Sequence, residues 1–363
     1  MFSKKFISLT HWRLIIPAFL LSCFGLLSIF SSSLNRGDFF NFEKQLVAVA
    51  VSLLVALAIS FVDLRFLKAN SYLIFSLYVL SLVSLGGLLL VGGHIRGIQG
   101  WYKIGPVSID PEPFVAIILI IVLSKYFSSR HVEIHMLRSV FFSGMYVFVP
   151  IGLVLFQPDL GSSLTLMAIW LGMVLFSGIK TKHIVLLFVL FGMVFALGWN
   201  FYLHDYQKQR ILAFINPEID AKGVAWSANQ SKIAIGNGGL LGQGIGQGSQ
   251  TQYGFLSEPK TDFIFSAVAE EFGFLGIFVL FVLFLALFWQ IIAVVFQAQS
   301  NFTRLFAFGF AFLLLAQTAI NIGMCLGLFP VVGIPLPFVS YSGSFTLAFY
   351  VGMGVLMSLE KKG

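Results

Sequence analysis

Residues 263–292 read FIFSAVAEEFGFLGIFVLFVLFLALFWQII, and the only charged side chains in this apolar run are Glu270 and Glu271. A helix of about 20 mainly apolar residues is long enough to cross the hydrocarbon core of a bilayer. The run is therefore predicted to be a transmembrane helix. Several other segments share its character, which indicates an all-α, polytopic membrane protein.

Ten segments have the length and composition of a membrane span. They are residues 12–32, 45–62, 71–92, 113–128, 139–156, 160–179, 183–203, 263–292, 303–327 and 338–358. The fourth is short, so eight to ten spans are compatible with the sequence and ten is the prediction. All of them are assigned to a single membrane domain covering residues 1–363.

The composition agrees with a membrane protein. The chain is 58% hydrophobic and 10% charged, with a mean hydropathy of +0.94, whereas soluble domains carry about 25% charged residues. The net charge of +7 could suggest nucleic acid, but no basic cluster supports that partner. Cys23 and Cys325 lie in apolar runs and predict no disulfide framework. The first apolar run lacks a small-residue cleavage site, so we expect a span and not a signal peptide.

The distribution of Lys and Arg predicts the orientation. With the N-terminus inside, the cytoplasmic segments contain thirteen such residues and the short outer loops contain four. Cytoplasmic loops of membrane proteins are enriched in Lys and Arg. Both termini are therefore predicted to be cytoplasmic, and the long polar segment 204–262 between spans 7 and 8 is predicted to lie outside. A loop longer than about 15 residues is usually functional or disordered.

Two shorter outer segments also look structured. Residues 93–112 include Trp101 and Tyr102, aromatic residues that suit the headgroup level of a membrane. Residues 328–343 contain three prolines within eight positions, which forbids a regular helix there. This apolar but non-helical stretch is predicted to re-enter the membrane, where such backbone must be covered by protein or line a cavity.

Four acidic residues are predicted near membrane depth: Asp159, Asp262, Glu270 and Glu271. Carboxylates at that depth indicate a functional site, but Asp159 and Asp262 could each also be a helix N-cap. The cap is the favoured interpretation for Asp159, and a chemical role is favoured for Asp262. On a continuous helix Glu270 would lie about 80° from Asp262, so it could share the site or make inter-helix hydrogen bonds.

The long loop is rich in glycines and cations. The glycines of residues 236–248 lack the ending and the context of a nucleotide-binding motif; they could let backbone amides approach a phosphate, or form a flexible loop. The cations are Lys208, Arg210, Lys222, Lys232 and Lys260. With an outer-face carboxylate they could form a base and a phosphate clamp, or simply a solvated loop with balanced charge. A metal site at His131 and His135 is disfavoured, because the zincin order is absent.

Several motifs together resemble one family. They are Gln157–Gly161, Gln209-Arg-Ile with Asn216-Pro217, Asn229–Gly239, Glu258–Gly276, Asn321-Ile-Gly-Met and Gly333–Tyr341. In this order they are similar to the SEDS (shape, elongation, division and sporulation) proteins, and the short termini resemble the RodA branch. The resemblance extends over more than half of the chain.

The resemblance implies a peptidoglycan glycosyltransferase of the bacterial inner membrane, which polymerises lipid II on the outer face for elongation and shape. It implies an inverting reaction with Asp262 as the essential residue, and a class B penicillin-binding protein and elongation-complex proteins as partners. No cofactor is certain, although Mg or Mn could bind at the diphosphate. The candidate substrate-binding residues are Arg210, Lys232, Lys260, Glu258, Asp159, Glu270, Trp101, Glu112 and Ser340.

The chain departs from the family pattern before the fourth span. Gly100 stands where the family usually has Arg, and Ala116 stands where it has Lys. The family's Gln-Pro-Ser-Glu motif reads Asp110-Pro-Glu-Pro113, so that Glu112 is one residue out of register. Near the end, Ser342 replaces a glycine. These departures allow a divergent polymerase, an altered substrate or lost activity.

Two other functions remain open at this point. A lipid-linked precursor transporter would also use broken helices and intramembrane carboxylates. An inactive scaffold that positions a crosslinking partner would keep the fold without the chemistry.

Overall fold

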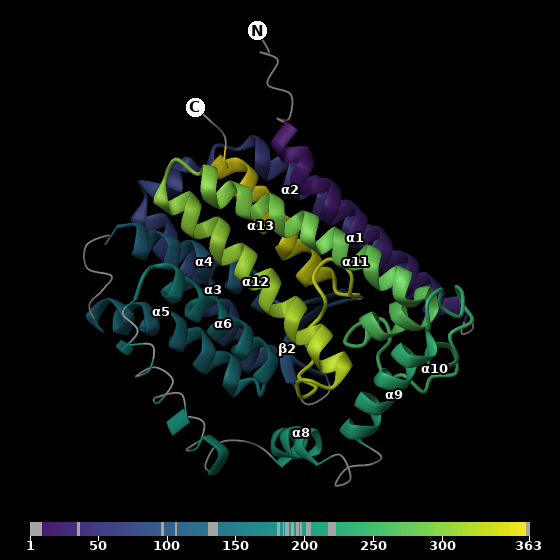
Figure 1. Ribbon diagram of the computed structural model, residues 1–363. Helices are drawn as coiled ribbons and strands as arrows, with labels where there is room; N and C mark the ends of the chain where they lie inside the picture. Colours follow the sequence, from purple (N-terminus) through teal and green to yellow (C-terminus); the bar gives the residue numbers. More distant parts are fainter. Residues whose placement is uncertain are drawn as a thin grey trace.

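The computed structural model is shown in Figure 1. It describes residues 9–34, 37–95, 98–105, 107–129, 137–179, 205–216 and 223–360, with scattered positions between 182 and 200. The predicted span 183–203 and the pair His131 and His135 therefore lie largely or wholly outside the described residues.

Long helices form the body of the molecule. They are α1 (Leu9–Leu34), α2 (Phe40–Phe61), α3 (Ser71–Val91), α4 (Glu112–Ser128), α5 (Leu137–Phe156), α6 (Leu160–Phe176), α11 (Ile264–Gln297), α12 (Asn301–Leu326) and α13 (Gly343–Glu360). Within the described ranges, seven are long and apolar enough to cross a membrane, namely α1, α2, α3, α5, α11, α12 and α13. The protein is thus a multi-pass membrane protein. At 17 residues each, α4 and α6 are at the lower limit for a span.

The short helix α4 is the centre of the bundle. It packs against α3, α5, α6, α12 and α13, and most of its side chains are buried. Ile120 and Leu123 are wholly inaccessible. Because apolar residues surround this helix on every side, it needs no polar face and shows no helical periodicity in the sequence.

Smaller elements gather at one end of the bundle, opposite the start of α1 and the end of α13 (Figure 1). They are β1 (Gly93–Ile95), β2 (Ile98–Ile104), β3 (Val107–Ile109), α8 (Asp205–Ile215), α9 (Val224–Asn237) and α10 (Ser249–Gln252). The short helix η1 (Leu64–Lys68) instead connects α2 to α3. The long polar segment is thus largely helical where the structure describes it.

The three strands correct the prediction of an all-α fold. β2 pairs antiparallel with both β1 and β3, with Trp101 opposite Gly93 and Lys103 opposite Ser108. The Tyr102 hydroxyl donates to the Ser84 carbonyl at 2.6 Å and so ties the sheet to α3. The prediction that this segment is structured was right, but its strands were not foreseen.

The long helix α11 is broken at Gly273, where φ is 63° and ψ is −161°. Before the break its residues are almost all buried, whereas Phe274, Phe278 and Leu285 beyond it are more than half exposed. The prediction of one continuous helix was therefore wrong. A left-handed φ is readily available to glycine and interrupts the helical hydrogen-bond ladder.

The glycine-rich loop fills this break. The amides of Phe274 and Leu275 donate to the carbonyls of Gly239 (2.9 Å) and Leu240 (3.1 Å). In return, the amides of Gln243 and Gly244 donate to the Glu270 (2.9 Å) and Glu271 (3.0 Å) carbonyls of α11.

Glycine is required at this contact because the two backbones nearly touch. A Cβ on Gly238 would lie 1.9 Å from the Ala269 carbonyl oxygen, and one on Gly242 would lie 2.1 Å from that of Glu271. These two glycines thus allow the loop to pack closely against α11. Neither the phosphate-binding loop nor the flexible loop considered from the sequence predicted this role.

Candidate active site

Asp262 lies in the turn before α11 and not at its N-cap. The cap position is Phe263, and no side chain caps the helix there, so the alternative that made Asp262 a helix cap was wrong. The argument that placed Glu270 near the face of Asp262 fails as well, because Asp262 lies outside the helix.

A single amide from α12 holds the backbone of Asp262. Asn321 donates through Nδ2 to the Asp262 carbonyl (3.0 Å) and to the Ile334 carbonyl (2.8 Å). The side chain thereby joins the turn before α11 to the segment 327–342 that connects α12 to α13. Asn321 belongs to one of the motifs quoted above, but the sequence did not predict that it holds the turn of Asp262. The one additional sign was a polar amide within an apolar helix.

A second connection comes from the other end of the same segment. The Ser340 hydroxyl donates to the Thr261 carbonyl (2.7 Å) and accepts from the Leu336 amide (2.8 Å). The Tyr341 amide donates to the Lys260 carbonyl (2.8 Å). Ser340 was predicted to bind substrate, but the structure buries it and gives it a positioning role.

The segment 327–342 is non-helical and partly buried, as its prolines predicted. Phe338 is 2% exposed and has a φ of 64°, a conformation that costs about 1–3 kcal/mol for a non-glycine residue. Its ring packs against Phe349 at 5.5 Å and Tyr350 at 5.3 Å. Aromatic packing against α13 therefore stabilises a strained backbone next to the site.

The Asp262 carboxylate faces Gly333 of this segment. A Cβ on Gly333 would lie 3.7 Å from Oδ2 of Asp262, and Gly333 has a φ of 77°. Asp262 is partly exposed. Its backbone is thus fixed from two sides while the residue stays partly exposed, which is the arrangement that a general base requires.

Asp159 lies across the same segment from Asp262. It caps α6 by accepting from the Ser162 amide (3.0 Å) and hydroxyl (2.7 Å), so the favoured interpretation was correct. A Cβ on Gly161 would lie 2.7 Å from the Val332 carbonyl oxygen, one residue before Gly333. Burial raises the pKa of Asp159, while the bonds from Ser162 and the charge of Arg210 oppose the rise.

Two of the predicted cations meet beside this segment. Arg210 of α8 and Lys232 of α9 line a small cavity of about 40 Å³, which Gly327, Phe329 and Val331 close from the other side. A Cβ on Gly327 would lie 3.6 Å from Nζ of Lys232. Segment 327–334 thus runs past both cations and then past Asp262.

The other predicted site residues are placed elsewhere. Lys260 donates to the Ser33 hydroxyl of α1 at 2.9 Å, and Glu258 is exposed with a φ of 49°. Trp101 lies in β2, opposite Gly93. Lys222 is outside the described residues.

Glu270 holds α10. Its carboxylate accepts from the amides of Gln250 (2.7 Å) and Thr251 (2.9 Å) and from the hydroxyls of Thr251 (2.7 Å) and Ser249 (3.3 Å). All four donors belong to the long loop, and Glu270 is fully buried. The structure therefore gives Glu270 a structural role, and its predicted substrate contact stays a prediction.

Glu112 begins α4 and is 4% exposed. Among the described residues, neither of its carboxylate oxygens has a hydrogen-bond partner. Asp110 lies beside it and accepts from the Glu112 amide at 3.0 Å, while the Asp110 amide donates to Ser344 of α13. Burial and the nearby charge of Asp159 raise the pKa of Asp110 to about 7.

A family model matches almost the whole chain. Residues 11–363 fit the FtsW/RodA/SpoVE model, described as a cell cycle protein. The chain belongs to this family. The SEDS resemblance drawn from the motifs is thereby confirmed, and the relatives support its RodA-like character.

Named relatives cover the chain along most of its length. The chain is 33% identical over 328 residues to peptidoglycan glycosyltransferase MrdB of Escherichia coli, covering 90% of this chain and 88% of the relative. It is 32% identical over 359 residues to stage V sporulation protein E of Bacillus subtilis, with 96% of each chain covered.

Solved structures agree with these relatives. A chain from a study of how a peptidoglycan synthase complex coordinates polymerization and crosslinking matches with a TM-score of 0.82 and 28% identity, covering 96% of this chain and 97% of that one. The rod shape determining protein RodA of Thermus thermophilus matches with a TM-score of 0.71 and 26% identity, with 96% of each chain covered.

The structure shows where one departure from the family's sequence pattern lies. Ala116, at the family's usual Lys position, is 1% exposed inside α4. A cation there would lie one turn from Glu112 on the same helix. The buried, unpartnered Glu112 thus coincides with the absence of the basic residue that the family pattern would place beside it.

Proposed function

We propose that this protein is a peptidoglycan glycosyltransferase that polymerises lipid II, acting in cell elongation and shape. The observation that carries the proposal is the arrangement around segment 327–334. The turn of Asp262 is fixed by Asn321, and the cavity with Arg210 and Lys232 adjoins the same segment. The names of the relatives support a glycosyltransferase acting on peptidoglycan.

In the proposed mechanism Asp262 is the general base. It accepts the proton of the acceptor sugar hydroxyl while that oxygen forms a bond to the anomeric carbon of the donor. The bond from the anomeric carbon to the polyprenyl diphosphate breaks, and the configuration inverts as in an inverting glycosidase. The electron pair leaves with the diphosphate, whose charge Arg210 and Lys232 stabilise.

The binding of a divalent cation at the diphosphate stays a prediction. Among the described residues, no group of three or more His, Cys, Asp or Glu side chains is arranged to hold a metal ion. No step of the mechanism is therefore assigned to a metal.

The proposed topology has ten spans with both termini in the cytoplasm. The seven long helices, the shorter α4 and α6, and the segment 183–203 supply them. The Lys and Arg distribution favours this orientation, which puts α8, α9, α10 and Asp262 on the outer face. A class B penicillin-binding protein is the proposed partner, supported by the synthase complex to which the fold is similar.

Polymerisation of purified lipid II in detergent tests the function. Without compartments a transporter yields no polymer, and an inactive scaffold yields none even with its partner present. We expect glycan polymer from the wild-type protein with its partner. Asp262→Asn should fold and bind lipid II but polymerise it about 10²–10⁴-fold more slowly, the usual contribution of a general base.

The matched control is Asp38→Asn, at an exposed carboxylate in the connection between α1 and α2. It should keep the wild-type rate. Wild-type polymerisation by purified Asp262→Asn would refute the catalytic assignment. No polymer from the wild-type protein with its partner would refute the proposed function.

A further inference from the structure

A second cavity lies far from Asp262, where α3, α4 and α5 meet. Its volume is about 420 Å³, within the range of small-ligand sites. Arg138 is eighteen residues before the end of α5 at Phe156, or about 27 Å along the helix axis. The cavity therefore belongs to the opposite end of the bundle from the Asp159 turn.

One wall of the cavity is an apolar stripe on α5. Phe142, Met145 and Val149 follow one another at intervals of three and four residues and share one face of the helix. Their exposed fractions are 37%, 51% and 47%, so the cavity opens sideways. In a membrane protein this direction faces the acyl chains of the bilayer.

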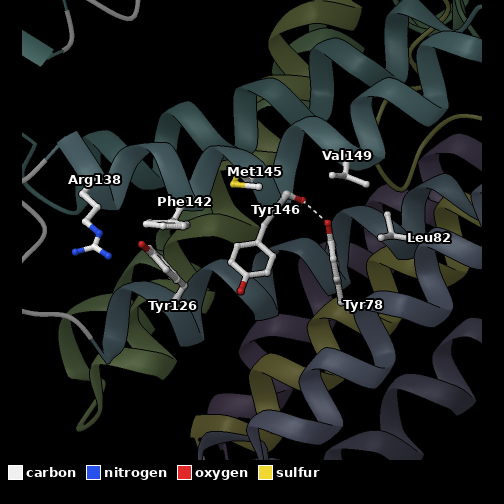
Figure 2. A pocket seen from close by; sticks show the side chains of 8 residues that line it. All are labelled: Tyr78, Leu82, Tyr126, Arg138, Phe142, Met145, Tyr146 and Val149. Carbon is white, nitrogen blue, oxygen red and sulfur yellow. Dashed lines mark hydrogen bonds between the residues drawn. The ribbon is translucent and has the colours of Figure 1, made fainter.

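The floor of the cavity is aromatic and fixed. The Tyr78 hydroxyl donates to the Tyr146 carbonyl at 3.0 Å, drawn as a dashed line in Figure 2. The ring of Tyr146 lies 5.6 Å from that of Tyr78 and 6.0 Å from that of Tyr126. These contacts join α3, α4 and α5, so the groove is formed before any ligand arrives.

Arg138 lies at one end of this groove (Figure 2). It is exposed, lies in the first turn of α5, and its guanidinium is 5.6 Å from the Phe142 ring. Within the described ranges, no carboxylate forms a salt bridge with it. The neighbouring cation on α4, Lys125, instead donates to the Lys68 carbonyl. Arg138 and the positive end of the helix dipole therefore favour an anion at this point.

We propose that this groove binds an anionic phospholipid, with its phosphate at Arg138 and one acyl chain along α5. The charge and the apolar wall are complementary to such a lipid. Val149 follows Arg138 by eleven positions, a distance of about 17 Å along the helix, which accommodates most of an acyl chain. Basic pockets between transmembrane helices bind acidic headgroups for the same reasons. The site is separate from the proposed catalytic centre and does not depend on its chemistry.

Native mass spectrometry of the purified full-length protein tests the proposal. Dioleoylphosphatidylglycerol and dioleoylphosphatidylcholine are added at equal concentration, and retained lipid is counted. We expect phosphatidylglycerol to bind at least about fivefold more tightly, the effect of one cation near an anionic headgroup. Arg138→Gln should remove this preference. Arg13→Gln, at an exposed arginine near the start of α1, should retain it.

A second variant tests the acyl part of the site. Met145→Trp fills the groove without changing charge and should lower retention of both lipids. Thermal unfolding in phosphatidylcholine micelles checks that each variant is folded. Should Met145→Trp fail to fold, Val149→Trp serves the same purpose on the same wall.

Three results would overturn the proposal. One is an undiminished preference for phosphatidylglycerol in folded Arg138→Gln. Another is displacement of bound lipid by millimolar glycerol 3-phosphate, which would make the site a phosphate site without an acyl requirement. The third is equal retention of uncharged polyprenol or phosphatidylcholine, which would make the groove a nonspecific apolar surface.

Discussion

Two buried glutamates of this protein show opposite ways of placing a carboxylate inside a membrane protein. Glu270 is fully buried and accepts four hydrogen bonds from α10 and its flanks. Glu112 is 4% exposed and, among the described residues, has no hydrogen-bond partner for either oxygen. A buried polar group is inexpensive when partnered and costly when it is not. Glu270 therefore stabilises the fold, whereas the burial of Glu112 opposes it.

The largest expected effect is the loss of Glu270. Glu270→Ala leaves two buried amides and two hydroxyls without their acceptor, which should destabilise the protein by about 3 kcal/mol or more. Thermal unfolding in detergent measures it. The control is Glu271→Gln, because Glu271 accepts from the Gln252 side chain and its Oε2 has no partner among the described residues. A larger loss in the control than in Glu270→Ala would contradict this interpretation.

The next largest effect on stability is expected where the glycine-rich loop packs against α11. Gly238→Ala forces a Cβ against the Ala269 carbonyl, 1.9 Å away, and should cost about 1–3 kcal/mol because backbone must move. Gly236→Ala, two residues earlier in α9, meets nothing within 4 Å and should be neutral or stabilising by up to about 1 kcal/mol. Equal melting temperatures for the two variants would show that the close approach contributes nothing.

Substitution of Glu112 should change the stability in the opposite direction to substitution of Glu270. Glu112→Gln replaces a buried carboxyl group whose oxygens have no hydrogen-bond partner among the described residues, and it should stabilise the protein by about 1 kcal/mol. If Glu112 contacts substrate, the same variant should slow polymerisation about tenfold, the effect of one lost polar contact. Melting temperature and initial rate, measured on one preparation, test both. A lower melting temperature would show that Glu112 supports the fold.

A pH dependence of stability is expected from Asp110. Its pKa is raised from 3.8 to about 7 in the folded protein, so the native state holds a proton that the unfolded state loses above about pH 4. The contribution of Asp110 to stability should thus be complete below pH 3.8 and decrease as the pH rises to about 7. Asp110→Asn should flatten this part of the stability profile. An unchanged profile would mean that Asp110 titrates normally.

The membrane helices could be predicted closely because length and apolar composition alone define them. The predicted span 71–92 became α3, Ser71–Val91, and the span 113–128 became α4, Glu112–Ser128. The cap of Asp159 was predicted because it depends on local chemistry. The same reasoning failed at Asp262, since Asn321 and Ser340 hold that turn from distant parts of the chain.

The break at Gly273 had no local signal. Glycine is frequent in transmembrane helices, and the residues from Phe274 to Trp289 that follow this one are apolar. The break becomes stable only because loop residues 239–244 supply hydrogen bonds from a separate segment. Such pairing between distant backbones leaves no periodic pattern in the sequence. The site was predicted in part for the same reason: its charged residues and the non-helical segment 328–343 were visible in the sequence, but the position of that segment between Asp262 and the cations was not.

The break also sets the height of Asp262 above the lipid. Residues 274–297 alone are about 36 Å long as a helix, enough to cross the roughly 30 Å hydrocarbon core. The nine residues from Ile264 to Phe272, all buried except Phe272, add up to about 14 Å beyond that core. On the proposed topology, Asp262 therefore lies in the headgroup layer or above it. At that level the hydrophilic sugars of a polyprenyl-linked donor can reach the carboxylate while its tail remains in the bilayer.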